Sequence, residues 1–374
     1  MQMNNTKCNH FVPRFYLKEF CDDNSKIWKW DLINNNIYNP NNLKAECSKK
    51  NLYTVKTKIT QKDIDIIKKV FQQNMTIMCE QTLNYLAIFL NDEIGNILTI
   101  TYTKDKDIKK RLNDSINESL NNNNISRTQE IIITELYENR FAPLYKQILE
   151  TNSIDFLNQT INDNIALYVC TNITIFVYLY LQRKLEEIVK TKIPKKLKTI
   201  KLKKNAYFDF ILYFILQDVR TENVINKLKE STALSKLSQY VNINDENFSF
   251  LTMTMLVIVI AEKLFYKNTP FKFILLKNDT NIKFVTSDSP CVNIYSSFIK
   301  DRFLQDNEIE FLFPLSPDLA LLMTEKPCYV RNNITIKNDK DIDIYNKTLI
   351  KTAKRYVYAN SLNLINRYRI EHNE

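Results

Sequence analysis

The chain has 374 residues, of which 44% are hydrophobic and 25% are charged. This balance is typical of a globular protein with a buried core and excludes a chain that is disordered throughout. The net charge is +10, from 52 Lys and Arg against 42 Asp and Glu. That charge suits a partner that carries phosphate, or it follows from the Lys-, Asn- and Ile-rich codons of an AT-rich genome.

Only one glycine, Gly95, occurs in the chain. A phosphate-binding P-loop, a dinucleotide-binding G-x-G-x-x-G turn and a nucleophile elbow each need more than one glycine, because the backbone there turns tightly or approaches a ligand closely. The composition therefore excludes all three sites.

The spacing of the cysteines and the apolar stretches of the sequence indicate the cellular compartment in which the protein is expected. Seven widely spaced cysteines without a C-x-x-C pair argue against a disulfide framework and a zinc ribbon. The N-terminus has no basic-then-apolar signal segment, so we expect a cytoplasmic protein. Apolar stretches at 165–182 and 250–265 are interrupted by Asn172, Glu262 and Lys263. They predict buried helices and no membrane span.

The N-terminal region, 1–60, predicts strands. Trp28 and Trp30 precede an Asn-rich turn and Tyr38, which is typical of a β-hairpin. A third strand is predicted at 51–59, where apolar and polar residues roughly alternate. The sequence TQKD at 60–63 resembles a capping box and predicts the start of a helix.

The central region, 61–268, predicts helices, since its segments have helical periodicity and almost no proline. An Asn-rich loop is expected at 120–126, and a Lys-rich connector at 190–204. Beyond the helix that starts at 60–63, the predicted helices span 105–120, 127–150, 161–190, 205–220, 223–240 and 246–266.

The C-terminal region, 269–374, returns to strands. Two β-rich runs around the polar turn at 278–281 predict a hairpin over 271–288. Strands are predicted at 308–313 and 319–323 around a proline turn, then a helix at 341–355 and a strand at 356–360. The fold class predicted is α+β, with a mostly helical middle, short strands from both terminal regions sharing one sheet, and a single domain over 1–374.

The segment HFVPRFYLKEF contains the first candidate site. The imidazole of His10 suits general base or metal chemistry, and the fork of Arg14 suits a carboxylate or phosphate. Tyr16 follows as a candidate substrate contact or core anchor. The alternative is that His10 is a buried hydrogen-bonding residue that holds the N-terminal arm in place.

The sequence VTSDSP at 285–290 contains the second candidate site, at the end of an apolar strand. Asp288 could orient an imidazole or bind a cation, while Thr286 and Ser287 could contact an anion. The alternative is an Asx-type turn in which Asp288 accepts backbone N–H bonds. Arg183, at the end of an apolar helix, either reaches a polar site or caps the helix.

These motifs, taken together, resemble a prokaryotic family called domain of unknown function 4238. Its members open with H-[FY]-[VI]-P-x-x-Y-L-x-x-F, followed by an aromatic strand, here IWKWD. The resemblance implies one domain that spans both ends, and it implies no activity. The remaining matching positions are Leu52, Tyr53, Glu80, Tyr180, Leu181, Arg183, Thr286, Ser287, Asp288, Pro290, the run Phe313 to Asp318, Asn346, Ala353 and Arg355.

Two function hypotheses follow. The first is a hydrolase acting on a phosphate-bearing substrate, such as a nuclease. Its proposed catalytic residues are His10, Asp288, Arg183 and Arg14. Its proposed substrate contacts are Tyr16, Thr286 and Ser287, and a divalent metal is one possible cofactor. The second is a non-catalytic protein that binds nucleic acid or another protein, in a defence or mobile-element context. It predicts a continuous basic surface and a dispensable His10.

Overall fold

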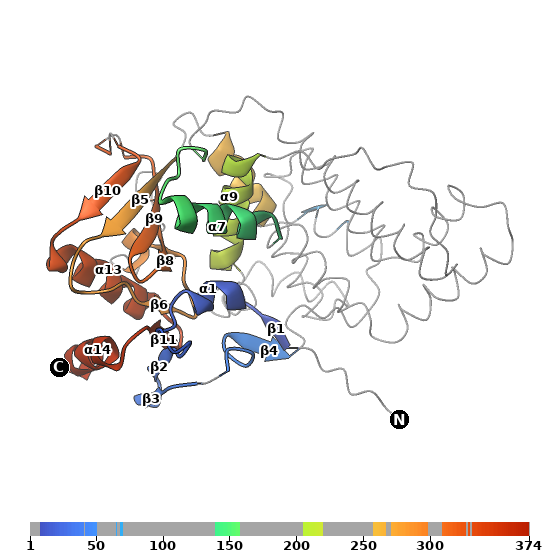
Figure 1. Ribbon diagram of the computed structural model, residues 1–374. Coiled ribbons are helices and arrows are strands. Elements are labelled where there is room, and N and C mark those ends of the chain that lie inside the picture. Colours follow the sequence, from blue (N-terminus) through green and yellow to red (C-terminus); the bar gives the residue numbers. More distant parts are fainter. Residues whose placement is uncertain are drawn as a thin grey trace, which may run out of the picture.

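The fold is seen in a computed structural model (Figure 1), and every structural statement below concerns the residues that it describes. These are residues 8–40, 42–50, 65, 68, 69, 139–157, 205–219, 257–266, 271–297, 309–326, 328, 329 and 331–373.

The N-terminal part contributes short elements around the aromatic motif. They are β1 (Cys8–His10), α1 (Arg14–Lys18), β2 (Trp28–Asp31), β3 (Asn36–Tyr38) and β4 (Ser48–Lys50). Two helices follow, α7 (Asn139–Thr151) and α9 (Ala206–Val219), then a helical segment at 257–265.

The C-terminal part alternates strands and helices. Its elements are β5 (Lys272–Asn278), β6 (Thr286–Ser287), β7 (Val292–Asn293), the 3-10 helix η3 (Ile294–Ser297), β8 (Glu310–Ser316), β9 (Leu319–Thr324), β10 (Asn333–Ile336), α13 (Asp339–Thr352), β11 (Tyr356–Ala359) and α14 (Leu362–Asn373).

Two larger sheets and one small ribbon form from these strands. The five-stranded sheet has the order β10-β5-β9-β8-β7 and is antiparallel except for the β10–β5 pair. The four-stranded sheet has the order β3-β2-β11-β6 and is antiparallel throughout. A separate antiparallel ribbon joins β1 to β4.

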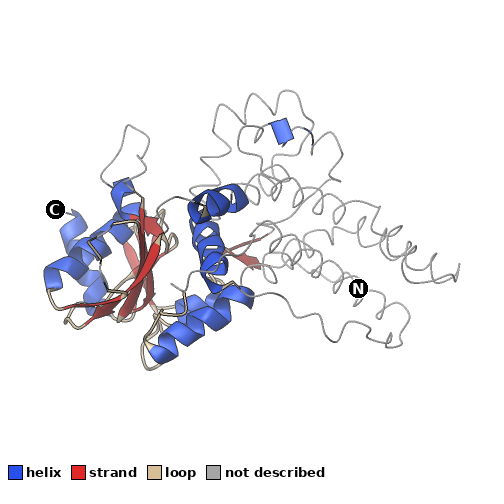
Figure 2. Cartoon of the chain, turned by 90° about the horizontal axis from the view of Figure 1, so that it is seen from above, coloured by secondary structure: helices blue, strands red, loops and turns tan. Residues whose placement is uncertain are grey.

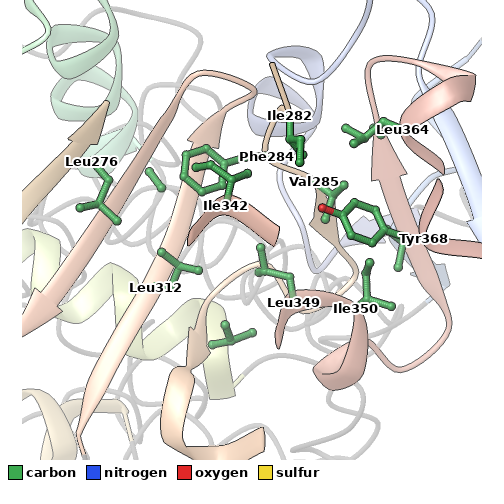
Figure 3. Packing of buried hydrophobic residues seen from close by; sticks show 14 of the residues in the cluster. Leu276, Ile282, Phe284, Val285, Leu312, Ile342, Leu349, Ile350, Leu364 and Tyr368 are labelled. Atoms are coloured by element: carbon green, nitrogen blue, oxygen red, sulfur yellow. The ribbon is translucent and has the colours of Figure 1, made fainter. Parts of the chain in front are cut away.

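One hydrophobic core lies between the two larger sheets and the C-terminal helices (Figure 3). Ile274 and Leu322 come from the five-stranded sheet, Trp30 and Val357 from the four-stranded sheet, and Leu349 from α13. Each is almost completely buried. Apolar side chains at every second strand position supply this core, as expected for sheets with one buried face.

The opposite face of the five-stranded sheet is covered by α7 and α9 (Figures 1 and 2). Phe214 of α9 packs against Phe273 of β5 and Phe313 of β8, with ring centroids 5.7 and 5.4 Å apart. Phe141 of α7 lies 6.3 Å from Phe313. Since α9 is buried along nearly all its length, it belongs to the interior of the fold rather than to its surface.

The structure confirms the α+β fold class and several predicted elements. The 27–38 region forms the β2–β3 hairpin, 319–323 lies in β9, and 356–360 contains β11. Strands from both terminal regions share the four-stranded sheet, as predicted. The five-stranded sheet, which takes all its strands from the C-terminal part, was not predicted.

The predicted hairpin over 271–288 is wrong. β5 pairs with β9 and β10, whereas β6 pairs with β11 in the other sheet. The Asn278 side chain explains the change of direction, because its amide donates to the carbonyls of Ile282 and Pro317. These bonds hold the polar turn against the β8–β9 turn and direct the following segment to the second sheet.

Several predictions lie outside the described residues. They are the strand at 51–59, the 120–126 loop, the Lys-rich segment 190–204, and most of the predicted central helices. The prediction of a single domain stays a prediction. Among the helices that the structure describes, none has the length and apolar character needed to cross a membrane.

Candidate functional site

One face of the four-stranded sheet is polar, and we call it the polar face. Directly paired residues of neighbouring strands point to the same side of a sheet. Lys29 of β2 pairs with Tyr38 of β3 and Tyr358 of β11, and Asp31 pairs with Tyr356. The polar face consists of Lys29, Asp31, Asn36, Tyr38, Thr286, Tyr356 and Tyr358.

Strand alternation explains why these residues gather. Trp28, Trp30, Val357 and Ala359 occupy the intervening positions and belong to or pack against the hydrophobic core. Because successive side chains of a strand point to opposite sides, the residues between them face away from that core. The segments WKWD and YVYA therefore each supply one apolar and one polar face.

A buried network of hydrogen bonds covers part of the polar face. The Lys29 ammonium donates to both carboxylate oxygens of Glu46, at 3.0 and 2.9 Å. The Tyr358 hydroxyl donates to Glu46 Oε2 at 2.9 Å, and Cys47 Sγ donates to that hydroxyl at 3.3 Å. The ion pair is largely buried, because only 16% of the Lys29 side chain and 8% of the Glu46 side chain are exposed. The network thus fixes the 46–47 segment on the sheet.

The Cys47 thiol is not activated in this environment. Its burial raises its pKa well above the usual value, and the negative charge of Asp288 raises it further. Burial also raises the pKa of the Tyr358 hydroxyl, with the neighbouring Cys47 and Glu46 adding to the shift. A thiol is nucleophilic as a thiolate, so the surroundings of Cys47 do not suit a cysteine nucleophile.

Asp31 and Arg355 form a second ion pair on the polar face. Arg355 donates through Nε at 3.3 Å to both carboxylate oxygens and through Nη2 at 2.9 Å to Oδ2. Burial alone would raise the pKa of Asp31, but hydrogen bonds from Arg355, Asn34 and Ile33 outweigh burial and hold that pKa below its usual value. Asp31 therefore remains ionised and orients the guanidinium.

The outer part of the polar face combines cations with aromatic rings. The Tyr356 ring has Lys29 Nζ at 4.8 Å and Arg355 Cζ at 4.9 Å from its centroid. Lys29 Nζ also lies 5.5 Å from the Tyr38 centroid. Tyr38 is 44% exposed, and the Arg355 side chain is 42% exposed. These distances are within the range of cation–π contacts.

His10 is held by the chain segment that covers the polar face. It lies at the end of β1, pairs with Ser48 of β4, and its Nδ1 is 3.0 Å from the Glu46 carbonyl oxygen. A carbonyl only accepts, so Nδ1 carries the proton and Nε2 is the basic nitrogen of the neutral ring. This bond fits the hypothesis that His10 holds the N-terminal arm, and it leaves the catalytic hypothesis untested.

Asp288 binds the backbone of the segment that leads into β11. Its carboxylate accepts from the backbone N–H groups of Lys354, Arg355 and Tyr356, at 2.9, 2.9 and 3.0 Å. Burial raises the pKa of Asp288, and these three bonds counter the rise. His10 contacts the 46–47 segment through the Glu46 carbonyl, and the negative charge of Asp288 raises the pKa of the Cys47 thiol.

The proposed substrate contacts lie inside the fold. Tyr16 and Thr286 are fully buried, and their hydroxyl oxygens are 2.6 Å apart. The Tyr16 hydroxyl donates to the Pro314 carbonyl at 2.8 Å, so Thr286 donates to Tyr16. The Ser287 hydroxyl donates to the Ser289 carbonyl and accepts from its N–H. These contacts connect segments of the protein, and a role in substrate binding stays a prediction.

The two predicted arginines differ in what the structure describes. Arg14 is the first residue of α1 and is exposed. Arg183 lies outside the described residues. No group of three or more His, Cys, Asp or Glu side chains that could hold a metal occurs in the described part of the chain.

Lys29, Glu46, Tyr356 and Tyr358 did not appear among the predicted site residues. Period-two alternation in WKWD and YVYA was a usable signal for three of them, because it places Lys29 with Asp31 and Tyr356 with Tyr358. Glu46 has no such signal, since it lies in a turn and meets Lys29 only through the tertiary structure.

Comparison with known proteins gives one match. The sequence profile described as Protein of unknown function (DUF4238) matches residues 9–173 and 180–363. No curated protein and no solved structure matches the chain. The profile covers both halves of the polar face and nearly the whole length. The chain therefore belongs to the DUF4238 family.

Proposed function

We propose that this protein binds single-stranded nucleic acid on the outer part of the polar face. One observation carries the proposal: the Lys29 ammonium and the Arg355 guanidinium lie 4.8 and 4.9 Å from the centroid of the Tyr356 ring. Aromatic rings on a sheet surface stack with bases, and neighbouring cations contact phosphates.

The exposure of Tyr38 supports this proposal. Tyr38 ends β3, an edge strand of the four-stranded sheet, and the residue is 44% exposed. A base can stack on such a ring without any displacement of core residues. Arg355 adds a phosphate contact, because its pair with Asp31 uses Nε and Nη2 and leaves the Nη1 group outside the pair.

The charges of this surface predict how binding responds to salt. Glu46 and Asp31 neutralise much of the charge of Lys29 and Arg355. Stacking then supplies more of the affinity than counterion release does. We expect only one or two phosphate contacts. The logarithm of the association constant should therefore fall with the logarithm of the salt concentration with a slope of about −0.7 for each of them.

Fluorescence anisotropy with a labelled 15-nucleotide RNA and DNA tests the proposal. Tyr38→Ala should weaken binding about 5- to 150-fold, because stacking on one ring contributes about 1–3 kcal/mol. Tyr38→Phe keeps the ring and should bind as the wild type does. Tyr266→Ala removes another exposed tyrosine, at 54% exposure, from a segment outside the sheet and should also have no effect.

Two results would overturn the proposal. One is equal affinity of the wild type and Tyr38→Ala for both oligonucleotides. The other is equal loss of affinity in Tyr38→Ala and Tyr266→Ala, which would indicate non-specific contact with exposed rings.

Hydrolysis of the same phosphate-bearing ligand is a second candidate function, with His10 as the general base. The hydrogen bond from Nδ1 to the Glu46 carbonyl supports this candidate, because it fixes the orientation and the tautomer of a half-buried imidazole. A backbone carbonyl would then orient the ring instead of Asp288.

Cleavage of the labelled RNA, with Mg²⁺ or with a chelator, tests this candidate. His10→Asn preserves a donor close to the Nδ1 position and removes Nε2. We expect it to keep the melting temperature and oligonucleotide affinity and to lose at least about 100-fold in cleavage rate. His10→Ala should lose stability as well. A wild type that cleaves neither RNA nor DNA under both conditions would exclude this candidate.

A further inference from the structure

A second polar cluster lies at the end of the five-stranded sheet, away from the polar face. Glu310 begins β8 and pairs with Thr324, the last residue of β9. The register places Glu310 on the same side as Leu312 and Leu322, which face α13 across the hydrophobic core. A carboxylate on this side of the sheet therefore adjoins apolar surroundings.

Glu310 is only half satisfied by its neighbours. Its side chain is 2% exposed, and Oε2 lies 2.6 Å from the Lys326 ammonium. Oε1 is also buried, and it has no hydrogen-bond partner among the residues that the structure describes. A buried carboxylate oxygen without a partner is unfavourable, and a water, an ion or a ligand can satisfy it.

One tyrosine contacts the ion pair of Glu310 and Lys326, and the charge of Glu310 raises the pKa of two more. Tyr295 of η3 has Lys326 Nζ at 4.8 Å from its ring centroid. The negative charge of Glu310 also acts on Tyr329, which precedes β10, and on Tyr345 of α13. Burial, with that charge next, raises the pKa of the Tyr345 hydroxyl to about 12 and raises that of Tyr329 also. A carboxylate among aromatic rings is the chemistry that recognises an organic ammonium group.

Lys326 shows how an ammonium group fits this environment. Its Nζ contacts the Glu310 carboxylate and the Tyr295 ring at the same time, and 38% of its side chain is exposed. The Lys326 side chain therefore reaches solvent, whereas the Glu310 side chain is buried.

We propose that Glu310, with Tyr295, forms a binding site for a small primary amine, and that the Lys326 ammonium takes the place of this amine in the free protein. The incoming ammonium replaces the Lys326 ammonium beside Oε2 and donates a further hydrogen bond to Oε1. No covalent step is involved. The site is independent of the proposed nucleic-acid function, since the two share no residue.

The n-butylammonium ion is the probe, because it has the length and charge of a lysine side chain. Isothermal titration and thermal melting are measured against sodium chloride at equal ionic strength. Lys326→Ala removes the tethered competitor and leaves its space, so we expect it to bind the probe about tenfold more tightly than the wild type. The melting temperature of this variant should rise with probe concentration.

A matched control is available in Lys283, whose side chain is also 38% exposed and pairs with Asp318. Asp318 is 59% exposed, so Lys283→Ala opens no buried carboxylate and should show no gain in probe binding. Glu310→Gln, alone and combined with Lys326→Ala, should abolish binding. If Lys326→Ala does not fold, comparison of the wild type with Glu310→Gln decides the question.

Equal probe affinity of Lys326→Ala and Lys283→Ala would overturn the proposal, as would probe binding that survives Glu310→Gln. Tighter binding of N-acetyl-lysine methylamide than of n-butylammonium would overturn the assignment to a free amine and indicate a protein lysine. Tyr38→Ala should leave amine binding unchanged, so failure here is distinguishable from failure of the nucleic-acid proposal.

Discussion

The hydroxyl oxygens of Tyr16 and Thr286 lie 2.6 Å apart, although the two residues are 270 positions apart in the sequence. Tyr16 belongs to the N-terminal aromatic motif, and Thr286 belongs to β6 of the four-stranded sheet. The Tyr16 ring also stacks on Phe313 of β8, with centroids 5.0 Å apart. One side chain therefore joins the N-terminal motif to both larger sheets.

Removal of the Tyr16 hydroxyl should destabilise the fold. Tyr16→Phe leaves the Thr286 hydroxyl and the Pro314 carbonyl buried without this partner, so we expect the free energy of unfolding to fall by about 1–3 kcal/mol. Urea unfolding measures the change, and a double-mutant cycle with Thr286→Val isolates the coupling. A Tyr16→Phe change no larger than that of the exposed Tyr38→Phe would contradict this contact.

Asp288→Asn should also destabilise the protein. The amide nitrogen of the Asn side chain cannot accept hydrogen bonds, so the backbone N–H groups of Lys354, Arg355 and Tyr356 lose part of their acceptor. We expect a loss of at least about 2 kcal/mol in the free energy of unfolding. Asp318→Asn, at an exposed carboxylate, should change it by less than about 0.5 kcal/mol. Thermal and urea unfolding of both variants give the comparison. A stable Asp288→Asn variant that lost RNA cleavage would favour the catalytic hypothesis instead.

Acid should remove the contribution of the Asp31–Arg355 pair. Since the pKa of Asp31 is lower in the folded state than in the unfolded state, the pair stabilises the fold above about pH 4 and this contribution disappears as the pH falls through the folded pKa. Asp31→Asn should be about 1–2 kcal/mol less stable than the wild type at neutral pH.

The comparison of the wild type with Asp31→Asn across a pH series isolates this effect. Asp288, whose pKa is raised, acts in the opposite direction and is common to both proteins. The difference in unfolding free energy should shrink as the pH falls below about 4. A difference that stayed constant down to acid unfolding would show that Asp31 titrates alike in both states.

Cys47 should resist alkylation in the folded protein. Burial, followed by the charge of Asp288, raises its thiol pKa, and little thiolate forms at neutral pH. Cys328 is exposed and serves as the internal reference. Peptide mass spectrometry after iodoacetamide treatment should show modification of Cys47 at least about 100-fold more slowly than of Cys328. Similar rates at both positions would indicate that the 46–47 segment opens readily.

Several residues of the family pattern make contacts that hold the fold together. Asn346 accepts from the Val285 N–H and donates to the Lys283 carbonyl and the Tyr368 hydroxyl. Arg355 and Asp288 make the contacts described above. The sequence motifs thus marked positions where distant segments meet, which is a different property from marking reacting groups.

Local patterns in the sequence were sufficient for many elements. Aromatic residues before an Asn-rich turn predicted the hairpin of β2 and β3, and the predicted helix at 341–355 and strand at 356–360 correspond to α13 and β11. The same patterns anticipated that strands from both terminal regions would share a sheet. Tyr16, which the aromatic motif predicted as a possible core anchor, is fully buried.

The tertiary structure alone decided which contacts the polar side chains make. Whether Asp288 orients His10 or holds the Lys354–Tyr356 backbone depends on which strand β6 joins, and a segment of two paired residues has no local signal for that choice. The pairing of Lys29 with Glu46, and of Lys326 with Glu310, arises where separate elements pack. Such contacts depend on distance in space and on burial, which are properties of the folded chain and leave no periodic trace along it.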